Sequence, residues 1–208
     1  MAEQFPAIRF ERYSDDAIVH CVSERQARFI RDKIAKRLED WGLTLHPVKT
    51  RIVYCKDANR RGSHEHERFD FLGYTFRPRV CKSKHGKLFA GFTPAVSDDA
   101  LKAIGTEIRR WRLHLRNGTT LKELARDINP IVQGWITYYG AFHASRLEPP
   151  LQRINAYLVR WGCQKYKRLK GHPRRAVRLL VNVARREPNL FAHWRIGLRP
   201  VGWAAGAR

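Results

Sequence analysis

The chain has 208 residues, 43% of them hydrophobic, and its 41 Lys and Arg exceed its 19 Asp and Glu to give a formal net charge of +22. This hydrophobic content excludes a disordered basic tail, and the charge indicates a polyanionic partner, for which we favour nucleic acid over a membrane surface. The four cysteines form no C-x-x-C pair, and no apolar run reaches the roughly 18 residues of a membrane span. We therefore expect a soluble, cytoplasmic protein with reduced cysteines and no membrane partner.

The first part of the chain mixes strand and helix patterns. Residues 8–22 read as a hairpin of two apolar strands with Ser14, Asp15 and Asp16 in the turn. An amphipathic helix of about 18 residues follows, begun by a capping box at Ser23 and carrying an apolar stripe as far as Trp41. We then expect a strand over 50–55 and two longer strands, over 69–80 and 87–94, joined by a Lys-Ser-Lys-His-Gly turn.

After Thr93-Pro94 the pattern becomes helical only. The first predicted helix begins at Ser97 and ends at Asn117-Gly118. The second begins at a Thr120/Glu123 capping box and is kinked or split at Pro130. A third helix runs through 151–161, and a fourth begins at Pro173. We therefore predict an α+β fold with two domains, residues 1–92 and residues 93–208. Lys and Arg exceed Asp and Glu by 7 in the first domain (19 against 12) and by 15 in the second (22 against 7).

Asp15 and Asp16 are adjacent carboxylates on a basic chain, where they repel each other unless cations or hydrogen bonds offset the repulsion. Mg²⁺ is a suitable cation, because it prefers oxygen ligands and takes one or two protein carboxylates together with phosphates and water. The alternative is that both are ordinary turn residues, since Asp is common in turns between strands.

Three motifs of the first part resemble those of reverse transcriptases. "RYSDDAIVHC" is similar to the Tyr-x-Asp-Asp strand-turn-strand, with Tyr13, Asp15 and Asp16 at the matching positions. "WGLTLHPVKTRIVYC" looks like the palm motif that carries a Lys-Thr pair, in which Lys49 is the matching lysine. "FDFLGYTF" resembles the primer grip, with the matching residues Phe71, Leu72, Gly73 and Tyr74.

The second part resembles the thumb or maturase domain of group II intron-encoded proteins, in "LARDINPIVQGWITYYGAF" and "INAYLVRWGCQKYKRLKG". Together the motifs cover roughly residues 8–170 in the family order. The resemblance implies a partial reverse-transcriptase palm followed by a helical maturase domain, with RNA-directed DNA polymerase ancestry. In this family two Mg²⁺ ions are held by the Tyr-x-Asp-Asp acids and by a third Asp on an earlier palm strand, which this sequence lacks.

We therefore interpret the chain as a truncated reverse transcriptase/maturase that binds group II intron RNA and assists its splicing, with an incomplete polymerase site. Two alternatives remain open. An upstream polypeptide could supply the fingers and the third Asp, so that the pair forms a split polymerase that uses Mg²⁺. The chain could instead be a decayed fragment that folds poorly, because a partial palm exposes a sheet edge and an apolar face.

Basic residues of the helical part are the candidates for RNA contact, since Lys and Arg on helix faces neutralise phosphates. The candidates are Arg109, Arg112, Arg116, Lys165, Lys167, Arg168, Arg174 and Arg175. We expect Trp111, Trp135 and Trp161, which lie on apolar stripes, to belong to the core. The cluster His64-Glu65-His66 has no matching cysteine spacing, and we expect it to be a solvated loop.

Overall fold

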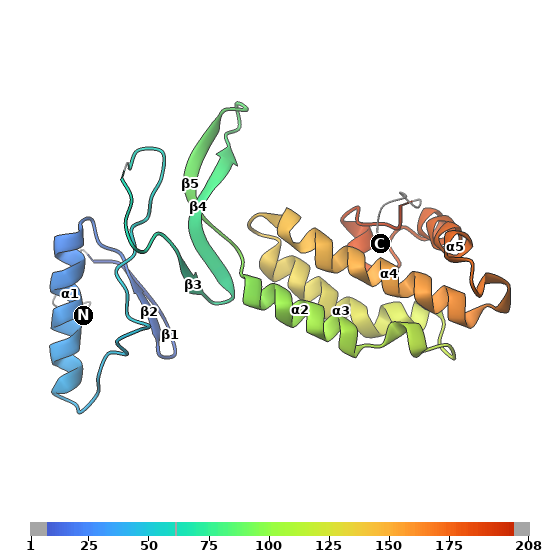
Figure 1. The fold of residues 1–208 in the computed structure, drawn as a ribbon, viewed down its shortest axis with the longest axis horizontal. Coiled ribbons are helices and arrows are strands. Elements are labelled where there is room, and N and C mark those ends of the chain that lie inside the picture. The colour runs from blue at the N-terminus through green and yellow to red at the C-terminus, as the bar shows by residue number, and fades with distance from the viewer. Residues whose placement is uncertain (1–7, 61, 202–208) are drawn as a thin grey trace. The chain divides into compact units, whose positions relative to one another are not determined.

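The computed structural model describes residues 8–60 and 62–201 (Figure 1). It has the expected α+β composition and divides into two compact units: residues 8–71 with 76–93, and residues 72–75 with 94–201. The units do not follow a single cut between residues 92 and 93, because the short segment 72–75 is part of the second unit.

The hairpin and the first helix of the first unit form near the expected positions. Strands β1 (Phe10–Tyr13) and β2 (Asp16–Val19) pair antiparallel, and helix α1 runs over Glu24–Glu39. The Ser23 hydroxyl accepts a hydrogen bond from Gln26 N (3.2 Å), and Gln26 Oε1 accepts one from Val22 N (2.7 Å). The helix ends before Trp41, whose side chain is 71% exposed, so the apolar stripe stops earlier than predicted.

The other strands are β3 (Phe69–Phe71), β4 (Tyr74–Lys82) and β5 (Leu88–Val96), in the order β3-β4-β5. The strand predicted over 69–80 is interrupted at Leu72 and Gly73, because both residues have positive φ angles (49° and 76°) and reverse the chain. The strand predicted over 50–55 is absent. This segment forms isolated backbone hydrogen bonds, such as Tyr54 N to His66 O (2.8 Å), and no ladder with a neighbouring strand.

The first unit has very little core of its own. Among its described residues Ile30 is the one large hydrophobic side chain that is buried, at 2% exposed. Ten large apolar side chains of the same unit are exposed: Phe10, Tyr13, Val22, Phe29, Trp41, Leu43, Val48, Val80, Leu88 and Phe89. An isolated two-stranded hairpin and a three-stranded sheet that bury so little depend on contacts beyond their own side chains for stability.

The second unit is a helical bundle. Its helices are α2 (Asp98–Arg110), α3 (Leu121–Tyr139), α4 (Glu148–Lys165), α5 (Pro173–Arg186) and α6 (Ala192–Arg195), with short 3₁₀ helices η1 (Leu113–Leu115), η2 (Ala144–Leu147) and η3 (Lys167–Leu169). The Ser97 cap and the Thr120/Glu123 capping box are confirmed. Helix α2 ends at Arg110 and not at Asn117-Gly118, because Arg112 has a left-handed conformation (φ 46°). Helix α3 continues through Pro130 without a break.

Helix α4 lies at the centre of this bundle, in contact with α2, α5 and the 3₁₀ helices (Figure 1). Its residues Leu151, Ile154, Leu158 and Trp161 are at most 1% exposed, so the expectation for Trp161 is confirmed. Trp111 and Trp135 are partly buried against the same core, with their rings stacked at 5.5 Å between centroids. No helix within the described residues is both long enough and apolar enough to cross a membrane.

Candidate metal hairpin and nucleic-acid interface

Asp15 and Asp16 lie at the tip of the β1–β2 hairpin. Tyr13 pairs with Asp16 in the antiparallel register, so Ser14 and Asp15 form the two-residue loop and Asp16 begins β2 instead of lying in the turn. Ser14 is left-handed (φ 54°), and its carbonyl accepts a hydrogen bond of 2.9 Å from Arg12 Nε. Both carboxylates are exposed, and neither has an ion-pair partner among the residues that the structure describes. The tip is therefore an accessible pair of hard oxygen donors, the ligand type that Mg²⁺ prefers.

No further metal ligand joins these two acids in the part of the chain that the structure describes, where no group of three or more His, Cys, Asp or Glu residues comes together. Lys49 is exposed in the turn that follows His46, and no hydrogen bond or ion pair links it to Asp15 or Asp16. His64, with its ring 4.0 Å from the Tyr54 ring between centroids, lies in a polar loop, as expected for this cluster.

The expected primer grip is a tight turn that is bonded to the helical unit. The Tyr74 hydroxyl donates to the carbonyl of Tyr138 on α3, and the Tyr138 hydroxyl donates to Leu72 O at 2.9 Å. Ser97 N, at the start of α2, donates to Gly73 O at 2.9 Å. Burial raises the pKa of the Tyr74 phenol, and the neighbouring Tyr138 contributes to the same shift. Three hydrogen bonds therefore fix the turn to the ends of two helices.

Gly73 is required at this turn for two reasons. Its φ of +76° is a conformation that costs residues with a side chain roughly 1–2 kcal/mol. A Cβ at this position would also lie 2.7 Å from the Tyr139 hydroxyl. Phe71, the first residue of the same motif, ends β3 in the other unit and is half-buried. The motif is thus divided between two structural environments, which the sequence pattern alone did not indicate.

Two of the eight basic candidates hold the loop between α2 and α3. Arg116 forms an ion pair with Asp127, and its carbonyl accepts a hydrogen bond from Trp161 Nε1 (3.1 Å). Lys165 Nζ donates to the carbonyls of Asn117 (3.0 Å) and Thr119 (2.7 Å) and lies 5.4 Å from the centroid of a Trp161 ring. Both side chains hold the loop between α2 and α3 in place, so their charge is less available to a ligand.

The remaining candidates have exposed side chains without ion pairs in the described residues. Arg109 is exposed and donates to the Thr106 hydroxyl at 2.9 Å. Arg112 is exposed in its left-handed position after α2. Lys167, Arg168, Arg174 and Arg175 are exposed on η3 and at the start of α5. These four are close in sequence, within nine residues of one another.

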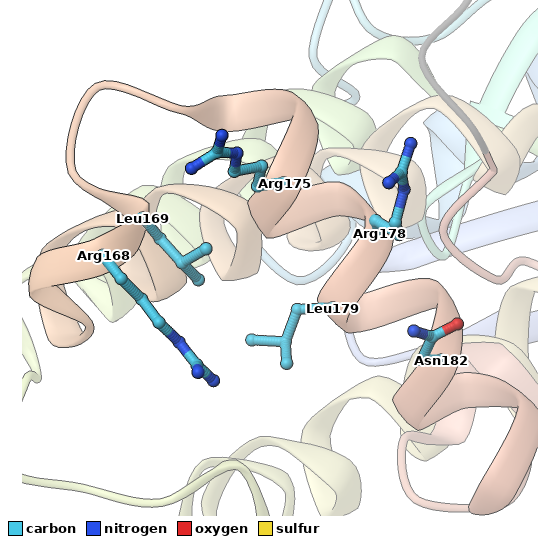
Figure 2. Close-up of a pocket in the computed structure, with 6 residues that line it drawn as sticks. All are labelled: Arg168, Leu169, Arg175, Arg178, Leu179 and Asn182. Carbon is cyan, nitrogen blue, oxygen red and sulfur yellow. The ribbon is translucent and has the colours of Figure 1, made fainter.

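A cavity of about 300 Å³ lies between η3 and α5 (Figure 2). It is lined by Arg168, Leu169, Arg175, Arg178, Leu179 and Asn182. The four α5 residues of this set are spaced i, i+3, i+4 and i+7, which places them on one helix face. The opposite face, with Ala176, Leu180 and Ala184, is buried in the core. Arg178 and Asn182 were not among the predicted contact residues, although their helical spacing from Arg175 was visible in the sequence.

The charge of this region is not neutralised internally. Residues 149–186 contain eleven Lys and Arg and no Asp or Glu. None of the eleven forms an ion pair with a residue that the structure describes. Elsewhere in the same unit cations are paired, as Lys102 is with Asp99 (2.9 Å) and Lys122 with Glu187 (3.6 Å). A segment with this many cations and no acid attracts polyanions.

Two family models match the chain, one in its first part and one in its helical part. Residues 101–179 match the family described as the group II intron, maturase-specific domain. The matched range contains α4, η3 and the first half of α5. Residues 1–76 match the reverse transcriptase (RNA-dependent DNA polymerase) family. The matched range contains the hairpin tip, Lys49 and the primer-grip turn. No curated protein matches the chain. With a reverse-transcriptase segment followed by a maturase domain, the chain belongs to the group II intron reverse transcriptase/maturase family.

Proposed function

We propose that the helical unit binds group II intron RNA through the basic surface of η3 and α5, and that this binding assists folding and splicing of the intron. We define the η3–α5 basic surface as Lys167, Arg168, Arg174, Arg175 and Arg178. The observation that carries the proposal is that these five exposed cations have no ion-pair partner among the described residues, on a domain that matches the maturase family.

Binding of this kind depends on phosphate neutralisation and needs no catalytic metal. Each phosphate that a Lys or Arg neutralises releases condensed counterions, so the logarithm of the affinity falls with the logarithm of the salt concentration by about 0.7–0.9 per contact. Arginines also form bidentate hydrogen bonds with phosphate oxygens, which adds orientation to the charge term. We therefore expect RNA binding to persist in EDTA and to weaken steeply with salt.

The test compares two triple variants of the full chain in fluorescence polarisation titrations with a structured intron RNA. The first variant is Arg174→Gln, Arg175→Gln and Arg178→Gln, which removes three unpaired charges. We expect it to reduce the salt slope by about 2 to 3 and to lower the affinity at every salt concentration.

The matched control removes three charges that are already paired within the same unit: Lys102→Gln, Arg110→Gln and Lys122→Gln. We expect this control to change the slope by less than about 1, since only the general field is reduced. The proposal fails if the wild-type chain has no affinity for structured RNA at low salt. It also fails if both triple variants lose affinity to the same extent.

A second function is supported by the first unit. We propose that Asp15 and Asp16 bind Mg²⁺ in RNA-directed DNA synthesis when a palm segment outside the present sequence, on the same or an upstream polypeptide, supplies the third carboxylate. Two unpaired carboxylates at a hairpin tip support this proposal, as do the ten exposed apolar side chains that a neighbouring palm segment would cover. Mg²⁺ would supply neutralisation of phosphate charge, and the two aspartates would orient it.

Primer extension on an RNA template tests this second proposal with the chain and the separately expressed palm polypeptide. Asp15→Asn and Asp16→Asn should each abolish extension, whereas Asp40→Asn, an exposed acid at the end of α1, should not. Equal extension by the Asp15→Asn mixture would contradict the assignment. A chain that aggregates alone and remains insoluble with the palm polypeptide would support the alternative of a decayed fragment.

The chemistry of the cysteines supports a proposal for the compartment. Cys21, Cys55, Cys81 and Cys163 are all free thiols, and burial raises the pKa of the Cys21, Cys55 and Cys163 thiols. Neutral, unpaired thiols support a reducing compartment, and we propose the cytoplasm.

A further inference from the structure

The cavity between η3 and α5 differs in chemistry from the rest of the basic surface, because its centre is apolar. We propose that this cavity, which we call the η3–α5 pocket, binds one unpaired nucleotide of the RNA, with the base against Leu169 and Leu179 and the flanking phosphates against the arginines. This inference rests on the proposed RNA binding and deepens it, because it specifies which feature of the RNA is recognised.

The pocket is held in shape by elements that are themselves fixed by the core. Helix α5 is oriented by its buried face, and Ala176 packs against α4 at Gly162, where an added Cβ would be in contact at 3.7 Å. The η3 segment is closed by backbone hydrogen bonds from Leu169 N to Tyr166 O (2.8 Å) and from His172 N to Leu169 O (2.9 Å). Leu169 is 7% exposed, so the surrounding packing holds its side chain in place in the pocket lining.

The directions of the side chains favour a nucleotide over an isolated phosphate ion. Figure 2 shows Leu169 and Leu179 extending toward the open centre, while the guanidinium groups of Arg168, Arg175 and Arg178 lie apart from one another around its edge. A clamp for one phosphate would bring the guanidinium groups to a common point. Cations that flank an apolar centre instead match a base with a phosphate on each side of it.

The size and the polar group of the pocket agree with this occupant. A volume of about 300 Å³ is at the lower end of the range for small-ligand sites, which suits one nucleotide. Asn182 presents an amide with both donors and an acceptor, which is the combination that base edges require. A paired base is stacked inside its helix and out of reach, whereas an unpaired base in a bulge or loop is free to turn outward.

The test uses two RNA hairpins of equal stem length, one fully paired and one with a single unpaired nucleotide, titrated against the full chain in EDTA. We expect the wild-type chain to bind the bulged hairpin about tenfold more tightly, the ratio that one hydrogen bond and one apolar contact provide together. Asn182→Ala should reduce this preference to about threefold and leave the salt slope unchanged, since no charge is removed. Leu179→Ala should act in the same direction.

Asn182 is exposed, so its replacement does not threaten the fold, and Gln133→Ala on α3 is a matched control that removes another exposed amide. Arg175→Gln should weaken binding of both hairpins and lower the slope, with the preference for the bulge retained in part. Equal wild-type affinity for the two hairpins would overturn the pocket assignment and leave the proposed RNA binding intact. Full preference in a folded Asn182→Ala variant would also overturn the assignment. No affinity for either hairpin would overturn both proposals.

Discussion

Acidification should destabilise the helical unit through His193, a histidine that is 0% exposed. Its Nε2 lies 2.9 Å from Asn155 Oδ1, which also accepts a hydrogen bond from Trp194 Nε1 (2.8 Å). Because an amide oxygen only accepts, the proton of the neutral ring is on Nε2, and Nδ1 is buried without a partner in the described structure. Protonation would place a positive charge at that buried atom, and burial lowers the pKa of His193 to about 3.

The sign and the size of the effect follow from linkage. The folded-state pKa of about 3 lies below the unfolded value of 6.5, so the unfolded chain takes up the proton first as the pH falls. Stability is therefore lost from pH 6.5 downward, at about 1.4 kcal/mol per pH unit, until the pH reaches the folded pKa near 3. Between pH 7.5 and pH 5.0 the loss that His193 contributes to the free energy of unfolding is about 2 kcal/mol.

Urea unfolding of the full chain and of His193→Gln, followed by tryptophan fluorescence at pH 7.5 and pH 5.0, measures this contribution. Other groups titrate in both proteins, so the quantity of interest is the difference in unfolding free energy between them. Gln keeps a donor for Asn155 and does not titrate. We expect the advantage of the wild type to shrink by about 2 kcal/mol on acidification. A difference that is equal at the two pH values would refute the buried, neutral histidine.

Two further substitutions separate structural from binding roles. Gly73→Ala should lower the free energy of unfolding by about 1–3 kcal/mol, because Gly73 has a positive φ and because an added Cβ would lie close to the Tyr139 hydroxyl. Thermal unfolding measures this loss. A variant as stable as the wild type would contradict the turn geometry at Gly73. Lys165→Met should cost about 1–3 kcal/mol because two backbone carbonyls lose their donor, yet it should weaken RNA binding less than Arg175→Gln does. The reverse order of RNA affinities would show that Lys165 is a direct contact.

The ends of the helices were predictable wherever a side chain acts on its own backbone. Ser97 accepts from Ala100 N at 3.1 Å, and Thr120 and Glu123 bond each other's backbone, all within three residues of sequence. Pro173 begins α5 as expected, because its fixed φ suits a first helical turn. Such interactions are local, and local patterns are what a sequence displays directly.

Features that depend on tertiary contacts were missed. The turn at Leu72 has a non-glycine residue with positive φ, and its stabilising hydrogen bond comes from Tyr138, 66 residues away. Helix α6 has only four residues and is held by Trp194 and His193 bonding to Asn155 on α4. The apolar pattern of residues 50–55 indicated a strand, but a strand forms only beside a partner, which the described structure does not provide there.

The same distinction applies to the candidate contact residues. Positive charge is visible in the sequence, so the strongly basic region of η3 and α5 was recognisable before the structure. The sequence does not display which cations are already used, because Arg116 is paired with Asp127 and Lys165 with carbonyls of a loop more than forty residues away. Nor did composition reveal the apolar centre between Leu169 and Leu179, which arises only when η3 packs against α5.

The two units differ in how many of their apolar side chains they bury, and this difference separates the two proposed functions. The helical unit closes a continuous core around α4, so its basic surface is positioned by its own packing and RNA binding needs no other part of a polymerase. The hairpin unit buries one large apolar side chain in its described residues and presents two metal-type ligands without a third. The proposed catalytic role of Asp15 and Asp16 therefore depends on a partner segment that supplies both an apolar surface and a carboxylate, whereas the proposed RNA binding uses side chains that η3 and α5 supply themselves.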